Sequence, residues 1–118
     1  MNLTRLAIAT SDGINVCPHL ARSTSYFVLE IENGEVLSRS VRERAPETCG
    51  NHATFVDMLT GCDAVICGGI GEGAAVSLSA AGIAPLVIAH PLTMEQALRS
   101  WIAGTLSTTD ARVCLCSH

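Results

Sequence analysis

The sequence predicts an α/β fold with a mixed five-stranded sheet and about three helices. Two alternating runs joined at Asn33-Gly34 indicate an antiparallel hairpin. Beyond residue 50, helical and strand-like segments alternate, which favours parallel strands with helices on the faces of the sheet. Several of the strand-like runs are almost continuously apolar, as strands buried on both faces are.

The first half of the chain contains three of the expected strands. Residues 5–10, RLAIAT, form a short apolar run that ends at a turn sequence, residues 11–13. Residues 25–41 split into two alternating runs around Asn33-Gly34, the pair that a tight primed turn favours. We therefore expect one buried strand followed by a two-stranded hairpin.

The second half is expected to form helices over residues 51–61, 71–82 and 93–104 and strands over residues 63–69 and 84–90. Asn51 can cap the first of these helices, and Gly61 ends it. Thr93 and Gln96 have the spacing of a capping box at the start of the last helix. The apolar stripe of that helix consists of Met94, Leu98, Trp101 and Ile102.

Composition and charge exclude several classes of protein. A chain of 118 residues with 48% hydrophobic and 15% charged residues suits one domain that folds alone. Its net charge is −4 and it has no lysine, so the basic surface of a nucleic-acid-binding protein is missing. No apolar run approaches the roughly 20 residues of a membrane-spanning helix.

The N-terminal residues do not have the pattern of a signal peptide, so we expect a cytoplasmic location. In a reducing compartment the six cysteines are expected to be core residues, ligands or reactive thiols, and not a disulfide framework.

Ligands of such sheets bind beyond the carboxyl ends of the parallel strands. Three loops are expected at that edge, residues 11–23, 46–52 and 67–73. The first offers Cys17 and His19, whose side chains could point the same way along an extended segment. The alternative is a packed cysteine and a histidine that satisfies a backbone carbonyl.

Cys49 and His52 form a C-x-x-H pair beside the expected start of a helix. The free N–H groups of a helix start favour thiolate, the form that binds metals and iron–sulfur clusters. The alternative is a loop thiol followed by an exposed histidine. The spacing alone does not decide between these two interpretations.

The glycine-rich turn GGIGEG, residues 68–73, also has two interpretations. Gly69, Gly71 and Gly73 could let backbone N–H groups approach an anion or an anionic cluster. They could equally form the tight strand-to-helix turn that such a unit needs. The run lacks the ending of a P-loop and fits a dinucleotide fingerprint badly, so an anion or cluster is favoured over a nucleotide phosphate.

The last residues contain a third group of potential metal ligands. Cys114, Cys116 and His118 would lie on one side of an extended segment. The alternatives are a disordered terminus or a strand that buries the cysteines. We expect residues 1–104 to form a single domain and residues 105–118 to be an extension that carries these ligands.

The order of these segments resembles the dinitrogenase iron-molybdenum cofactor biosynthesis family. The resemblance rests on CPHLARS, the hairpin YFVLEIENGEV, the run CGGIGEGAAVSLSAAGI and the helix TMEQAL, and it extends to about Gly104. It implies a ribonuclease-H-like fold with a mixed five-stranded sheet. It also implies a role in binding, carrying or inserting iron–sulfur or iron-molybdenum clusters during nitrogenase cofactor assembly.

The resemblance also implies roles for individual residues. CPHLAR matches a Ser-Pro-His-Phe-Gly-Arg-like loop of the family, so His19 takes the place of the family histidine and Arg22 that of its basic neighbour. Cys17 stands where serine is common. The variable, histidine-containing loop of the family falls at residues 49–52, which gives His52 a cluster-facing role. The cysteine-rich tail is not part of the shared pattern.

The leading hypothesis is a non-enzymatic carrier of an iron–sulfur or iron-molybdenum cluster. Cys49 and His52 would supply ligands, His19 and Cys17 would close the site, and the turn at residues 69–73 would accommodate the cluster. Cofactor-assembly or acceptor proteins are the expected partners. A homodimer through the apolar stripe of the last helix is an alternative to simple core packing of that stripe.

Three other functions are weighed against the carrier. A two-metal nuclease is disfavoured because Asp12 is the only carboxylate near the end of an expected inner strand. A regulatory module could bind small anions or nucleotides at GGIGEG without any thiol. A thiol-redox sensor would form a disulfide between Cys114 or Cys116 and a loop cysteine.

Overall fold

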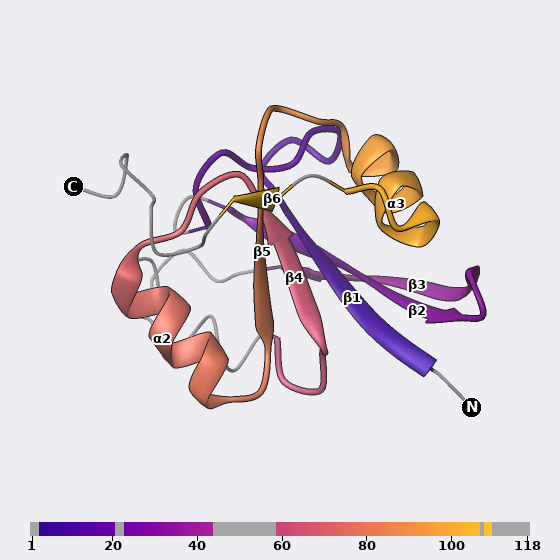
Figure 1. Cartoon of the computed structure of the whole chain (residues 1–118), viewed down its shortest axis with the longest axis horizontal. Coiled ribbons are helices and arrows are strands. Elements are labelled where there is room, and N and C mark those ends of the chain that lie inside the picture. The colour runs from indigo at the N-terminus through magenta and orange to yellow at the C-terminus, as the bar shows by residue number, and fades with distance from the viewer. Residues whose placement is uncertain (1–2, 21–22, 44–58, 107, 110–118) are drawn as a thin grey trace.

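The computed structural model describes residues 3–20, 23–43, 59–106 and 108–109. Within them, a mixed sheet lies between two helices and forms the middle of three layers (Figure 1). Helix α2 (Glu72–Ala80) packs on one face of the sheet, and helix α3 (Met94–Ala103) packs on the other. The predicted α/β architecture is confirmed.

The sheet has the strand order β3-β2-β1-β4-β5-β6. Its strands are β1 (Leu3–Thr10), β2 (Ser25–Glu32), β3 (Glu35–Glu43), β4 (Ala64–Cys67), β5 (Ala84–Ile88) and β6 (Thr108–Thr109). Strands β1, β4 and β5 are parallel, whereas β2, β3 and β6 are antiparallel to their neighbours. The five predicted strands are all present, and the two-residue β6 extends the sheet at its far edge. The ribonuclease-H-like label stays a prediction.

The hairpin turn has the predicted geometry. Asn33 and Gly34 have φ values of 53° and 80°, and positive φ at both central residues is what a tight primed turn requires. Farther along the hairpin, Val36 lies opposite Ile31 and Ser38 lies opposite Glu30. The residue between them, Leu37, is the extra residue of a β-bulge in β3.

Alternation along the strands divides the buried side chains into two cores. In β1, Leu6 and Ile8 belong to the core under α3, whereas Ala7 and Ala9 belong to the core under α2. Helix α3 contributes Leu98 to its core, and its partly buried stripe residues pack around it, as predicted. Each face of the sheet therefore has its own apolar layer.

Both described helices begin or end at predicted residues. Thr93 and Gln96 form the capping box of α3: the Gln96 amide donates to Thr93 Oγ1 at 3.1 Å, and the Thr93 amide donates to Gln96 Oε1 at 3.0 Å. Gly82, with φ of 82°, follows the end of α2, and Gly104 caps α3. No helix in the described part of the chain is long and apolar enough to span a membrane. The helix predicted from Asn51 lies largely outside the described residues.

Candidate functional site

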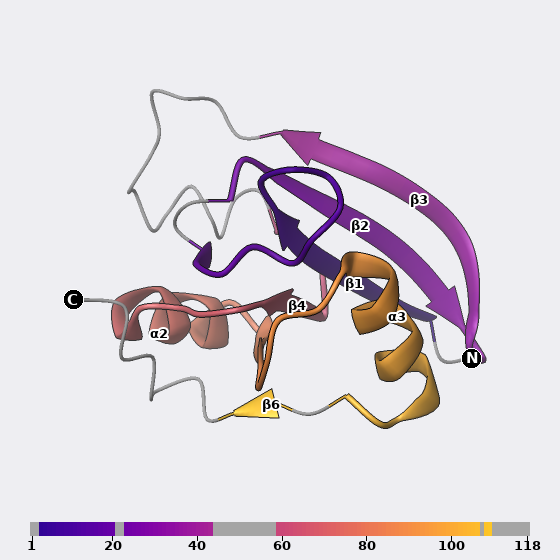
Figure 2. The same cartoon turned by 90° about the horizontal axis from the view of Figure 1, so that it is seen from above.

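The carboxyl ends of β1 and β4 lead into two of the loops that the sequence placed at the ligand edge. Backbone hydrogen bonds hold these loops together. The Gly68 amide donates to the Cys17 carbonyl oxygen, and the Leu20 amide donates to the Gly69 carbonyl oxygen, both at 2.8 Å. The loop after β1 therefore lies directly against the glycine turn after β4, as Figure 2 allows the reader to follow.

The same loop is also tied to the segment between β5 and α3. The Val16 amide donates to the Leu92 carbonyl oxygen at 3.0 Å, and the Met94 amide donates to the Ile14 carbonyl oxygen at 2.9 Å. Asn15 forms an isolated antiparallel bridge with Thr93 between these two bonds. Three loops that are distant in sequence thus form one connected edge, held mainly by backbone contacts.

A cavity of about 190 Å³ lies at this edge. Its lining residues are Val16, Pro18, Gly68, Ile88, Ala89, His90 and Pro91. No carboxylate is among them, although the chain carries a net charge of −4. Among the lining residues that the structure describes, exposed His90 has the one ionisable side chain. The described part of the lining therefore offers an imidazole between apolar walls.

His90 is not among the site residues predicted from the sequence. Its one sequence signal is its position two residues after the parallel strand β5, where ligand-binding side chains of such sheets are found. The signal is weak because APLVIAH is a continuous apolar run that ends in histidine, a pattern that assigns His90 to the strand itself.

Gly68 has a structural reason to be glycine. A Cβ atom at this position would lie 2.8 Å from Pro18 Cα and 3.0 Å from the Cys17 carbonyl oxygen. The glycine run was predicted to let the backbone approach a ligand closely. At Gly68 the close approach is instead to the loop after β1, and it lets the two loops pack together.

The other glycines of the run have separate positions. The carbonyl group of Gly69 accepts the hydrogen bond from Leu20, and Gly71 is the N-cap of α2, with no side-chain cap. Gly73 is exposed in the first turn of that helix. Ligand contacts by Gly69, Gly71 and Gly73 stay predictions.

Cys17 and His19 differ in their surroundings. The Cys17 side chain is 2% exposed in the core under α2, and its thiol donates to the His19 carbonyl oxygen at 3.0 Å. His19 is half-buried. In this conformation Cys17 is packed as a core residue, so its predicted role as a ligand would require the thiol to leave that hydrogen bond.

Two further cysteines are core residues. Cys62 and Cys67 are 5% and 0% exposed. Burial raises the pKa of the Cys62 thiol, against the opposing effect of the guanidinium groups of Arg42 and Arg5. Both cysteines are therefore unsuited to bind a metal as thiolates. Among the described residues, no group of three or more His, Cys, Asp or Glu side chains could hold a metal ion.

The remaining predicted site residues lie outside the described residues. They are Arg22, Cys49, His52, Cys114, Cys116 and His118. Their assigned roles stay predictions.

Asp12, the carboxylate considered for a nuclease, is engaged within its own loop. Its Oδ1 atom accepts hydrogen bonds from the amides of Ile14 and Asn15, both at 2.8 Å, and Oδ2 accepts one from the Asn15 side chain at 2.9 Å. The Asn15 amide is the largest cause of the lowering of the Asp12 pKa to about 2. The carboxylate acts as a brace for the loop after β1.

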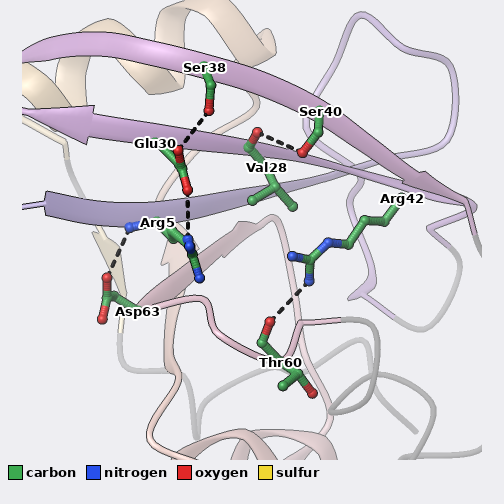
Figure 3. Close-up of polar contacts among 8 residues, drawn as sticks. All are labelled: Arg5, Val28, Glu30, Ser38, Ser40, Arg42, Thr60 and Asp63. Carbon is green, nitrogen blue, oxygen red and sulfur yellow. Dashed lines mark hydrogen bonds and ion pairs between the residues drawn. The ribbon is translucent and has the colours of Figure 1, made fainter.

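A separate set of polar contacts joins β1 and the hairpin to the segment before β4 (Figure 3). Arg5 forms an ion pair with Glu30 at 2.9 Å, and its backbone amide donates to Asp63 Oδ2 at 2.9 Å. Arg42 donates to the Thr60 carbonyl oxygen at 3.2 Å. These contacts join the hairpin to the start of β4 and do not involve the cavity.

Residues 2–104 match the sequence model of the dinitrogenase iron-molybdenum cofactor family. The chain belongs to that family. The match confirms the resemblance found in the order of the sequence motifs. For this member of the dinitrogenase iron-molybdenum cofactor family, no significant match was found among curated proteins.

Solved structures have the same fold as this family member. PH0822 is 28% identical, with a TM-score of 0.77, and the alignment covers 89% of this chain and 94% of that chain. Protein mj0327 from Methanocaldococcus jannaschii is 18% identical, with a TM-score of 0.73 and coverage of 93% and 98%. The apo form of the orange protein from Desulfovibrio gigas is 19% identical, with a TM-score of 0.73 and coverage of 92% and 94%. The latter two similarities concern the fold alone.

Proposed function

We propose that this chain binds and carries a metallocluster of the iron–sulfur or iron-molybdenum class. The observation that carries the proposal is the concave edge formed by three interlocked loops in a chain that belongs to the dinitrogenase iron-molybdenum cofactor family. The cluster is cargo in this proposal, and the protein is a carrier without catalytic activity of its own. Proteins of cofactor assembly would deliver and receive the cargo.

The described side chains supply some of the ligands that such a cluster would need. His90 borders the cavity, and half-buried His19 is the next residue in sequence after Pro18, which lines the cavity. Imidazole nitrogen is a ligand for iron, and a lining without carboxylates does not repel an anionic cluster. The interlocking of the loops supports a preformed binding surface, which would not have to be ordered at the moment of binding.

Thiolate ligands have to come from other cysteines than the buried ones. Cys62 and Cys67 lie in the core, and the Cys17 thiol is hydrogen-bonded there. The proposal assigns the thiolate to Cys49, with His52 as its neighbour, because the sequence pattern predicts both at the same edge. A carrier must also release its cargo, so a ligand set that is open and incomplete suits it better than a closed four-ligand site.

Cluster uptake under anaerobic conditions tests the proposal. The purified chain is offered an iron–sulfur or an iron-molybdenum cluster, and visible absorption and the metal content per chain are measured. We expect stoichiometric uptake by the wild type and loss of uptake in Cys49→Ala/His52→Ala. His90→Ala should retain less cluster than the wild type after gel filtration.

Cys62→Ala is the matched control for removal of a thiol. Cys62 lies in the core, two residues before β4, and has no part in the proposed site. It should take up the same amount of cluster as the wild type. Circular dichroism establishes that each variant is folded. A wild type that binds neither cluster contradicts the carrier function, and uptake that survives the double substitution contradicts the assignment of Cys49 and His52.

A further inference from the structure

A second cavity, of about 400 Å³, lies on the face of the sheet that α3 covers. Its lining residues are Ile8, Gly13, Ile14, Phe27, Leu29, Arg39, Thr93, Met94, Glu95 and Leu98. They come from β1, the loop after it, the β2–β3 hairpin and the start of α3, whose arrangement is visible in Figure 2. We call this space the α3 groove. Its volume lies in the range typical of small-molecule sites.

The walls of the α3 groove are mainly apolar. Ile8, Leu29 and Leu98 are buried core residues that form its floor, and Phe27 and Met94 are half-buried beside them. Helix α3 thus covers only part of this sheet face. Contact between an apolar ligand and these side chains would remove further apolar surface from water, which is worth about 25 cal/mol per Å².

One positive charge borders these apolar walls. Arg39 lies opposite Leu29 in the hairpin register, which places it on the α3 side of the sheet. Its side chain is exposed, and no described residue forms a hydrogen bond or ion pair with it. The carboxylate of the groove, Glu95, is paired with Arg99 at 2.9 Å. The guanidinium of Arg39 is therefore available to an anion.

We propose that the α3 groove binds a small apolar molecule that carries a carboxylate group. The apolar body would lie against Phe27, Leu29 and Leu98, and the carboxylate would contact Arg39. Guanidinium groups match carboxylates in geometry and charge, which favours a carboxylate over a neutral polar group. This site needs neither a thiol nor a metal and goes beyond the proposed cluster carriage.

The concave shape argues for a small molecule as the occupant. The floor and both walls come from one chain, and among the lining residues only Ile14 is a strongly exposed large hydrophobic side chain, at 64%. Beside the groove, Val41 lies opposite Phe27 and is 51% exposed. The buried Ile8, Leu29 and Leu98 nevertheless place most of the apolar contact surface inside the groove, where a small molecule reaches it better than a flat protein surface does.

Two matched probes test this proposal in the full chain. Naphthalene-1-acetate has an apolar ring system and a carboxylate, and naphthalene-1-acetamide has the same shape without the charge. Amide chemical shifts followed by NMR during titration give both the affinity and the location. We expect saturable shifts at Gly13, Ile14 and Leu98, and tighter binding of the acid than of the amide.

Arg39→Gln should weaken binding of the acid about threefold to tenfold and leave the amide unchanged, because the variant removes one partly solvated charge contact. Arg39→Ser/Ser40→Arg is the matched control. Successive strand residues point to opposite faces, so this double variant keeps the net charge and moves the guanidinium away from the groove. It should bind the acid as weakly as Arg39→Gln does.

Ile14→Asp gives an independent check, because this exposed residue can be replaced with little effect on folding. Its carboxylate should weaken binding of the acid more than binding of the amide. Equal affinities of the acid and the amide, wild-type affinity in the charge-swap variant, or shifts confined to other surfaces would overturn the proposal. So would a wild-type dimer, seen by sedimentation, that Ile14→Asp dissociates while neither probe binds.

Discussion

At the scale of single residues, Gly68 lies so close to another backbone segment that an added Cβ atom would meet Pro18 Cα at 2.8 Å. Its missing side chain leaves the space that Pro18 and the Cys17 carbonyl group occupy. Through this contact, the end of β4 fixes the position of the loop that carries His19. The absence of a side chain at Gly68 is therefore required for the two loops to pack against each other.

Gly68→Ala should lower the free energy of unfolding by about 1–3 kcal/mol, because the added Cβ forces two backbone segments apart. Urea denaturation measures this loss. The amide NMR signals of Cys17 and Leu20 should also shift, since both residues bond to this turn.

Gly82→Ala separates this steric effect from a backbone effect. Gly82 has φ of 82°, and nothing lies within 4 Å of the position of its added Cβ. Left-handed backbone conformation costs a non-glycine residue about 1–2 kcal/mol, so this variant should lose stability without shifting the signals of Cys17 and Leu20. Equal effects of both substitutions on those signals would contradict the packing role of Gly68.

Asp12 should contribute a pH-dependent term to stability. Its pKa is lowered to about 2 in the folded chain from a usual value of 3.8, so folding favours the ionised form. The contribution is fully present above about pH 4 and is lost as the pH falls toward 2. NMR titration of the carboxyl carbon should give a midpoint near 2, and Asp12→Asn should flatten the stability profile in this window.

Glu35→Gln is the control for removal of a carboxylate, because Glu35 is exposed at the start of β3. It should leave the profile of stability against pH unchanged between pH 2 and 4. A normal titration midpoint for Asp12 would show that its hydrogen bonds to Ile14 and Asn15 do not persist in solution.

Only part of the residue-scale site could be predicted from sequence. The position of the loop with Cys17 and His19 at this sheet edge was predictable, because the loop follows a recognisable apolar strand. Which of them is buried depends on contacts with the glycine turn, residues distant in sequence. The position of His90 in a cavity lining has the same origin, since the lining comes from three separate loops.

At the scale of elements, the start of α3 connects the sheet edge to the α3 groove. Thr93 closes the capping box, pairs with Asn15 and lines the groove. The box satisfies N–H groups that the first turn of a helix leaves free. The capping box of Thr93 and Gln96 therefore determines where α3 begins relative to the loop after β1.

Thr93→Ala should lower the free energy of unfolding by about 1 kcal/mol through loss of the cap. Thermal or urea denaturation provides the measurement. Thr105→Ala, at the other end of α3, is a suitable control, because the Thr105 hydroxyl makes only an exposed 3.4 Å contact with the Ser100 carbonyl oxygen. Its effect should stay within about 0.5 kcal/mol, and an equal effect of the two variants would contradict the role of the cap.

The elements themselves were largely predictable because their signals are local. Asn33-Gly34 requires only two residues with positive φ, and the capping box requires only a spacing of three. The bulge at Leu37 had no such signal, since it depends on how β3 aligns with β2. The short strand β6 likewise depends on pairing with β5 and not on its own sequence.

At the scale of the whole molecule, the sheet separates two apolar cores. Ile31 belongs to the core under α3 and Ile83 to the core under α2, and both are at most 3% exposed. Ile31 lies in β2, Ile83 directly precedes β5, and strands β1 and β4 lie between β2 and β5 in the sheet. The two side chains therefore have no shared neighbours through which their packing could be coupled.

Ile31→Val and Ile83→Val should each lower the free energy of unfolding by about 0.5–1.5 kcal/mol. The double variant should show the sum of the two losses within about 0.5 kcal/mol, because distant sites act independently. Urea denaturation of the four proteins of this cycle provides the test. A coupling above about 1 kcal/mol would mean that the two layers are not packed independently.

The convergence of loops was predictable at this scale from topology alone. Parallel strands end at one edge of a sheet, so the loops after β1 and β4 had to meet there. The α3 groove was not predictable in this way. It exists because α3 packs on the sheet through Leu98 and leaves Phe27 and Arg39 of the hairpin uncovered, and the extent of that cover follows from packing over the whole face.

The bulge in β3 has a consequence for the behaviour of the chain at high concentration. Strand β3 (Glu35–Glu43) is the edge of the described sheet, and an edge of nine regular residues is a template on which another chain can add a strand. The extra residue at Leu37 interrupts the regular row of N–H and C=O groups. The charged side chains of Glu35, Arg39 and Glu43 add hydration along the same edge. We expect these features to disfavour the addition of a strand from another chain along β3.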